Sequence, residues 1–155
     1  MRTINGIDEL RAGVGQHLGY SEYHAISQDE IDSFADLSGD HQWIHTDARR
    51  AAKGPFGSTI AHGLLTLSLG PRLAKEVYQI QGMTMGVNYG YDKIRFPAPV
   101  PVDSRVRLSA TLASVTDVAS GVQVGIVFVW EIEGKPKPAC VAEMLLRYSL
   151  AQPAA

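Results

Sequence analysis

The sequence predicts an α+β fold in which an antiparallel sheet covers an apolar helix. Two observations support this prediction. The first half of residues 60–78 is apolar on nearly every side, and a helix without a polar face belongs inside a core. Further along the chain, three runs alternate apolar with polar side chains, which is typical of antiparallel strands that bury one face.

Two helices are predicted before the apolar one. A short helix at residues 7–12 is followed by glycines. A second helix begins after Ser27, because Ser27 and Glu30 have the spacing of a capping box, and it ends at Gly39. At the other end of the chain, residues 151–155 are expected to fray.

The apolar helix is expected to run from residue 60 to Tyr78, after a glycine- and proline-rich loop. Pro71 removes one main-chain hydrogen bond, so a kink is expected near Gly70. A strand over residues 64–69 is the alternative, but the length of the whole segment favours a helix.

The alternating runs keep their apolar side chains on one parity. These positions are Val106, Leu108, Ala110 and Leu112, then Val122, Val124, Ile126, Phe128, Trp130 and Ile132, then Cys140, Ala142, Met144, Leu146, Tyr148 and Leu150. Upstream, the parity changes between Tyr91 and Ile94, which predicts a bulge or break near Asp92 and Lys93. Residues 134–138 form the loop between the last two strands.

Chain length and charge limit the class of protein. The 155 residues are expected to form a single domain, residues 1–155. A formal net charge of −2 offers no basic face to nucleic acid. No segment approaches the ~18 apolar residues of a membrane span, and the first residues given, MRTINGIDELRAGVG, lack the apolar stretch expected of a signal peptide. Cys140 is the only cysteine, so no internal disulfide forms and a cytoplasmic protein is expected.

Asp40 and His45 are the first candidates for chemistry. Residues five apart on an unbroken helix point away from each other, but Gly39 offers an exit from the helix that would let both side chains face one volume. A carboxylate beside an imidazole can hold and deprotonate a water molecule near neutral pH. The spacing alone favours the alternative, an aspartate that caps the following turn and a histidine that is packed or exposed by chance.

A metal site is not predicted. His41 and His45 form an H-x-x-x-H pair, but the zinc-protease version of this motif has a glutamate where Gln42 stands, and a third ligand is not evident nearby.

Ala61-His62-Gly63 opens the apolar helix. Helix N-termini leave N–H groups unpaired, and a glycine allows a ligand oxygen to approach the main chain. Gly63 is therefore either an oxyanion donor or a glycine required by close packing. His62 is interpreted as a structural residue that bonds to the backbone. Residues 88–100, which include Tyr89, either line a pocket or form an ordinary strand and turn.

Taken in order, the motifs resemble one family. They are Gly39-Asp40-x-x-x-x-His45, a glycine/proline loop, Ala61-His62-Gly63, and Arg95-Phe96-x-x-Pro99-Val100. This combination is similar to the MaoC-like dehydratases, the group of R-specific enoyl-CoA hydratases with a branch that includes nodulation protein N. The resemblance extends from about Ser27 to Tyr148.

The resemblance implies a hot-dog fold, in which an antiparallel sheet wraps a long central helix, and a homodimer with active sites near the subunit interface. It implies reversible addition of water to a trans-2-enoyl-CoA to give the (3R)-3-hydroxyacyl-CoA. Asp40 and His45 would be the catalytic dyad, and the Gly63 N–H would form the oxyanion hole. No cofactor is implied, since coenzyme A arrives as part of the acyl-CoA substrate.

The chain departs from the commonest family pattern between the two dyad residues. Gln42 and Trp43 stand where the family usually has Asn-Pro. Together with Tyr89, they are the expected substrate-binding residues, and the change puts the range of substrates in question.

Two other functions remain open on the same fold. Thioesterases of this fold often place a catalytic carboxylate on or beside the central helix, where the only acid between Gly63 and Tyr78, Glu76, lies far from the helix start. A non-catalytic acyl-CoA-binding or partner subunit would not need Asp40, His45 and Gly63, all of which are present.

Overall fold

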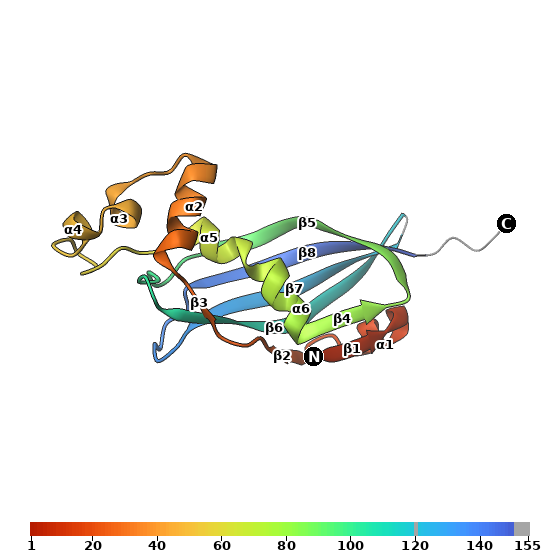
Figure 1. Ribbon diagram of the computed structural model, residues 1–155. Coiled ribbons are helices and arrows are strands. Elements are labelled where there is room, and N and C mark those ends of the chain that lie inside the picture. Colours follow the sequence, from red (N-terminus) through yellow and green to blue (C-terminus); the bar gives the residue numbers. More distant parts are fainter. Residues whose placement is uncertain (120, 151–155) are drawn as a thin grey trace.

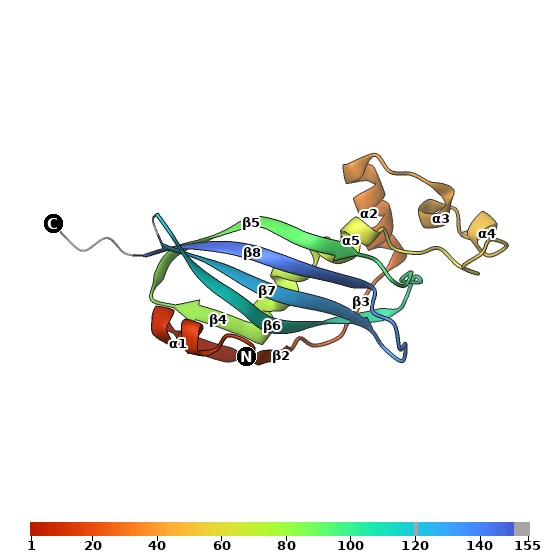
Figure 2. The same ribbon diagram turned by 180° about the vertical axis from the view of Figure 1, so that it is seen from behind.

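The protein folds as an antiparallel sheet wrapped around a broken central helix (Figures 1 and 2), as seen in a computed structural model that describes residues 1–119 and 121–150. The expected α+β class is therefore confirmed, while the expectation for residues 151–155 lies outside the described residues. In chain order the elements are β1 (Arg2–Asn5), α1 (Gly6–Ala12), β2 (His17–Tyr20), β3 (His24–Ala25), α2 (Gln28–Ser38), α3 (Trp43–Thr46), α4 (Ala48–Ala51), α5 (Gly63–Ser68), α6 (Gly70–Val77), β4 (Tyr78–Gln81), β5 (Met83–Arg95), β6 (Arg105–Val118), β7 (Gly121–Ile132) and β8 (Cys140–Leu150).

Helix α2 begins and ends as predicted. Its capping box is complete, since the Ser27 hydroxyl accepts from the Glu30 N–H at 3.2 Å and the Glu30 carboxylate accepts from the Ser27 N–H at 3.1 Å. Gly39 ends the helix with φ of 75°, a left-handed conformation that glycine adopts without strain. The chain then leaves the helix, which sets the direction of Asp40.

The central helix consists of two parts, α5 and α6, separated at Leu69, so the predicted kink is confirmed. Its predicted ends are wrong by a few residues. It begins at Gly63 because Ile60 and Ala61 are engaged with the main chain of residues 100 and 101. Tyr78 is extended and starts β4, which pairs in parallel with β1. None of the described helices is long and apolar enough to cross a membrane.

The sheet has the strand order β2-β6-β7-β8-β5, and β3 also pairs with β6. The predicted alternation is confirmed on β6, β7 and β8, whose buried side chains share one core with α5 and α6. The parity change in β5 is also confirmed as an irregularity, because its register against β8 shifts between Asp92 and Arg95 and Lys93 has φ of 54°. Strand β5 forms one end of the order, and its outer edge has no neighbour among the described strands.

The contact between α6 and β7 requires a glycine. A Cβ on Gly70 would lie 2.7 Å from Cζ2 of the fully buried Trp130. We expect Gly70→Ala to lower the free energy of unfolding by about 1–3 kcal/mol through overpacking, measured by urea denaturation. Gly90→Ala is the matched control, because a Cβ there meets nothing within 4 Å. Equal stability of the two variants would show that α6 can move away from Trp130 without cost.

Candidate active site

Asp40 lies in the turn between α2 and α3, with its side chain exposed in the single chain. The carboxylate Oδ1 accepts from the Gln42 N–H at 3.3 Å, and the Asp40 N–H donates to the Ser38 hydroxyl at 3.3 Å. The turn therefore holds the carboxylate beside the start of α3 instead of along the axis of α2.

His45 lies on α3 and is 6% exposed. Its Nδ1 is 2.7 Å from the Ile60 carbonyl oxygen. Because a carbonyl only accepts, Nδ1 carries the hydrogen, and the lone pair is on Nε2. Its main-chain N–H donates to the Gln42 carbonyl at 2.9 Å, so Gln42 contacts both dyad residues through its backbone.

Burial lowers the pKa of His45 below its ordinary value. The Ile60 carbonyl acts in the opposite direction, charge repulsion from His62 lowers the pKa further, and attraction to Asp40 raises it. The net direction is downward, so the imidazole is unprotonated at neutral pH and can accept a proton.

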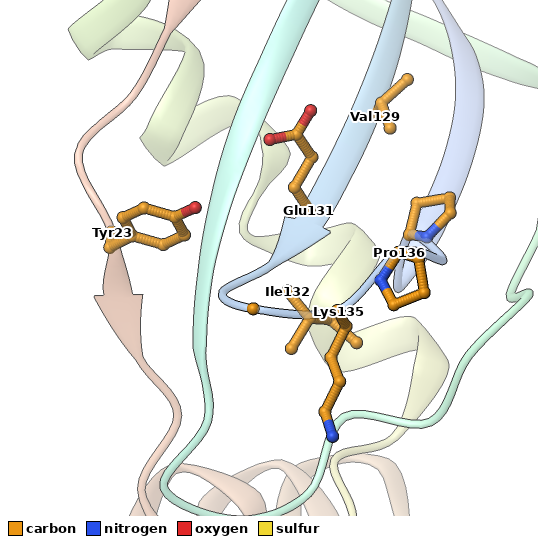
Figure 3. Close-up of a pocket in the computed structure, with 8 residues that line it drawn as sticks. Tyr23, Val129, Glu131, Ile132, Lys135 and Pro136 are labelled. Carbon is orange, nitrogen blue, oxygen red and sulfur yellow. The ribbon is translucent and has the colours of Figure 1, made fainter.

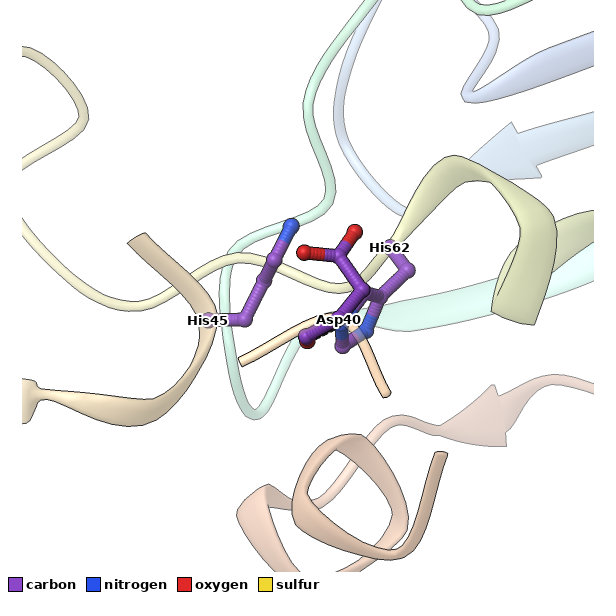
Figure 4. A group of neighbouring side chains, drawn as sticks. All are labelled: Asp40, His45 and His62. Carbon is purple, nitrogen blue, oxygen red and sulfur yellow. Dashed lines mark hydrogen bonds between the residues drawn. The ribbon is translucent and has the colours of Figure 1, made fainter. Parts of the chain in front are cut away.

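Asp40, His45 and His62 come together as a cluster (Figure 4). One ligand atom from each side chain lies within 4.8 Å of the other two. The sequence-based hypothesis that Gly39 lets Asp40 and His45 face one volume is consistent with this geometry. His62 joins them from the residue before α5.

The cluster is the place where a metal ion would bind, but its ring geometry does not suit one. The His45 and His62 rings are stacked with centroids 3.7 Å apart and planes inclined by 24°. An imidazole binds a metal along a lone pair in its own ring plane, at about 2.0–2.1 Å for zinc. The planes of the two stacked rings intersect much farther than 2.0–2.1 Å from either ring. One ion therefore cannot lie on a lone pair of both imidazoles at bonding distance. His41 is exposed and faces Asp36, so the H-x-x-x-H pair does not converge.

Gly63 is the first residue of α5, so its N–H has no acceptor within the helix, and no hydrogen bond among the described residues uses it. A Cβ at this position would lie 2.9 Å from Cγ of Phe96. Both readings of Gly63 made from the sequence therefore have a basis: the N–H is free, and the Phe96 ring packs against the glycine.

A cavity of about 300 Å³ lies between His45 and the start of α5, and Asp40 is not among its lining residues in the single chain. Its lining combines His45 and Gly63 with mainly apolar side chains: Phe56, Ile60, Ala61, Thr66, Phe96, Ala98, Pro99, Val100 and Ala139. An apolar pocket with a few convergent polar groups is the usual form of a small-molecule site.

The three expected substrate-binding residues are not among the lining residues of this cavity in the single chain. Gln42 is exposed, and the Trp43 ring lies against Gly54 and under the guanidinium of Arg50 at 4.4 Å. Tyr89 is on β5, 54% exposed, beneath the Arg147 guanidinium at 3.4 Å. Their role in substrate binding stays a prediction.

A larger hollow, about 420 Å³, lies beside the turn between β7 and β8 (Figure 3). Tyr23, Glu131 and Lys135 supply its polar groups. Glu131 already pairs with Arg107 at 2.8 Å, so the hollow lacks a free acid–base pair of the kind found at the dyad. The smaller cavity is therefore the better candidate for chemistry.

Gln28 is a supporting residue that sequence reasoning missed. Its amide donates to the His45 carbonyl at 2.8 Å and accepts from the Thr59 hydroxyl at 2.6 Å. It thus joins the start of α2 to α3 and to the chain before α5. In the sequence, its only signal is a position inside the capping box, which suggests no such role.

Comparisons with known proteins identify the family of the chain and agree with its fold. The model of the MaoC like domain matches residues 10–133, and the chain belongs to this family. It is 51% identical to 3-hydroxyacyl-thioester dehydratase Z of Mycobacterium tuberculosis over 149 residues, which cover 96% of this chain and 99% of that protein. It is 43% identical to nodulation protein N of Rhizobium leguminosarum bv. viciae, over 88% of this chain and 87% of that one.

Solved structures show the same fold. R-hydratase PhaJ1 from Pseudomonas aeruginosa superimposes with a TM-score of 0.71 at 22% identity, covering 92% of this chain and 88% of that chain. The monoamine oxidase regulatory protein from Archaeoglobus fulgidus gives a TM-score of 0.78 at 20% identity, covering 98% and 100%. The fold is the hot-dog fold, as the resemblance implied.

Proposed function

We propose that the protein is an (R)-specific enoyl-CoA hydratase that adds water reversibly to trans-2-enoyl-CoA. The observation that supports this most strongly is the Asp40–His45 pair beside the apolar cavity that begins at Gly63. The likeness to a 3-hydroxyacyl-thioester dehydratase, which extends over nearly the whole of both chains, points to the same reaction class.

The reaction uses groups that these residues possess. The thioester withdraws electrons through the double bond, so C3 is open to attack by water. His45 accepts a proton from the water at Nε2, with Asp40 holding the water, and the C3–O bond forms. Negative charge then develops on the thioester oxygen, where the free Gly63 N–H stabilises it. A proton returned to C2 completes the 3-hydroxyacyl product. No cofactor takes part in these steps.

Two features support His45 as the base in this proposal. Its Nδ1 hydrogen is committed to Ile60, which leaves the lone pair of Nε2 for the reaction. Its lowered pKa keeps that lone pair free at neutral pH. Asp40, which is more exposed and already accepts from the Gln42 N–H, acts as the water-holding partner.

The proposal is tested with purified protein and crotonyl-CoA together with longer trans-2-enoyl-CoAs. Loss of the enoyl absorbance, with (3R)-3-hydroxyacyl-CoA found by chiral chromatography, is the expected result. Release of free thiol without hydration would instead establish the thioesterase alternative. Thioester hydrolysis is not expected. Glu76, the acid of the central helix, lies near the end of α6 that is farther from Gly63, and its carboxylate already accepts from the Glu22 N–H at 3.0 Å.

Binding of acyl-CoA with neither reaction would favour the partner-subunit alternative. A non-catalytic subunit would have an inert Asp40–His45 pair. His45 nevertheless has the hydrogen bond to Ile60 that leaves its Nε2 lone pair free, and it lines the cavity. Mixing with a candidate partner chain and repeating the hydration assay separates an inactive subunit from an inactive preparation.

The protein is also proposed to be a homodimer that pairs through β5. This 13-residue strand is an open edge with exposed apolar side chains, including Met85 and Val87, and open apolar edges are normally covered. We expect a dimer by light scattering at micromolar concentration and a monomer for Val87→Lys. Thr116→Lys, at an exposed site on β6, is the control. A monomeric wild-type protein would contradict the proposal.

A further inference from the structure

We propose that His62 is a positioning residue, which holds the main chain of Asp40 and the ring of His45 in register with the Gly63 N–H. The inference rests on the proposed function, because it gives His62 a part in the same reaction. Its evidence is a set of contacts that bring three separate segments to one side chain: the turn after α2, helix α3, and the start of α5.

The first contact fixes the position of Asp40. His62 Nε2 lies 2.9 Å from the main-chain oxygen of Asp40, across 22 residues of sequence. A carbonyl oxygen only accepts, so Nε2 carries the hydrogen and donates it. Because His62 directly precedes Gly63, this bond sets how far the Asp40 turn stands from the start of α5.

The second contact fixes the ring of His45. The two imidazoles stack at 3.7 Å, and the Phe34 ring packs on His62 at 5.0 Å and 52°. His62 is therefore held by α2, is 4% exposed, and covers one face of the base. Removing the ring would let His45 tilt and admit water to a face that is now dry.

The remaining nitrogen of His62 shows that this arrangement has a cost. Nδ1 is buried and has no hydrogen-bond partner among the described residues. A buried acceptor without a partner gives up its hydrogen bond to water on folding and gains none in return, which is unfavourable. An aromatic side chain such as phenylalanine would fill the same space without that cost, but could not donate to Asp40. The choice of histidine is explained if both the donor and the ring are needed.

Two variants separate the two contacts. His62→Phe keeps an aromatic ring against His45 and loses the donor to Asp40. We expect its kcat to fall by about 10–100-fold with little change in KM, as for a misplaced catalytic group. His62→Gln keeps a side-chain N–H donor and loses the ring. We expect a smaller loss in kcat, and the acid limb of kcat/KM to move upward by about 0.5 pH unit because His45 is better hydrated.

The control is His17→Gln. Like His62, His17 makes one hydrogen bond through Nε2, here to the Ser109 hydroxyl instead of a main-chain oxygen, and packs on an aromatic ring, that of Tyr20, but it lies on β2 away from the site. It should leave both kcat and the acid limb unchanged. Equal losses in the Phe and Gln variants with an unmoved acid limb would reduce His62 to a space-filling residue and overturn the proposal, as would normal kinetics in both.

NMR of the imidazole nitrogens gives a readout that does not depend on turnover. In the wild-type protein, His62 should carry its hydrogen on Nε2 and His45 on Nδ1, and the titration of His45 should move to higher pH in His62→Gln. If the wild-type protein fails to hydrate enoyl-CoA but these signals are found, the proposed function fails while the positioning role stands. A hydrogen on Nδ1 of His62 would refute the positioning role even in an active enzyme.

Discussion

Asp40→Asn and His45→Gln are each expected to lower turnover of crotonyl-CoA by at least ~10²-fold, the lower range for loss of general acid–base help. Asn keeps the shape of Asp40 and its acceptor for the Gln42 N–H, but removes the charge. Gln removes the imidazole of His45 and the lone pair that the Ile60 contact leaves free. Steady-state kinetics measure the effect, and KM is expected to change little if the proposed coenzyme A thioester makes most of its contacts away from Asp40 and His45.

The double variant should be hardly slower than either single variant, because residues that act as a unit are not additive. His41→Gln is the matched control: this histidine is exposed and its ring faces Asp36, so activity should persist. A loss in His41→Gln equal to that of His45→Gln would revive the metal interpretation. Normal turnover in a folded Asp40→Asn would end the hydratase assignment.

Much of the fold could be predicted from the sequence because its signals are local. The capping box at Ser27 and the parity of β6, β7 and β8 depend on neighbours within a few residues, and the structure has them as expected. The start of the central helix was misjudged because it depends on distant partners. Ala61 looks helical by composition, yet its N–H donates to the Val100 carbonyl, which no local pattern indicates. Strands β1 and β4, four residues each, pair in parallel and were too short to predict.

The site could be predicted in part. The turn at Gly39 suggested how Asp40 and His45 could converge, and the resemblance favoured that reading over chance packing. The contacts that hold the pair were not visible in the sequence. Gln28 reaches His45 across 17 residues, and His62 reaches Asp40 across 22. His62 was expected to bond to the backbone, which is confirmed, but neither its partner nor its stacking on His45 follows from the order of residues.

Gly63→Ala is expected to lower kcat by about 10²-fold, in the range seen when one oxyanion donor is lost. The added Cβ would lie 2.9 Å from Cγ and 3.0 Å from both Cδ atoms of Phe96. Contacts at Cγ, close to the Phe96 backbone, cannot be relieved by turning the ring alone. Either α5 or the segment at Phe96 must therefore shift. A shift of α5 moves the Gly63 N–H away from the position proposed for the thioester oxygen, and a shift of Phe96 changes the lining of the cavity that would hold the thioester against that N–H. The loss should fall on kcat more than on KM, because charge on that oxygen is greatest in the transition state.

The double variant Gly63→Ala/Phe96→Leu distinguishes a displaced N–H from a blocked cavity. Leucine lacks the ring whose three atoms crowd the new Cβ, so α5 can return toward its original position. The alanine should therefore lower kcat by a smaller factor in the Phe96→Leu background than in the wild-type protein. A Gly63→Ala variant that binds substrate poorly but turns it over at the normal rate would mean that the alanine only narrows the cavity. In that case the start of α5 would not be the oxyanion site, and the charge on the thioester oxygen would have to be met by another donor.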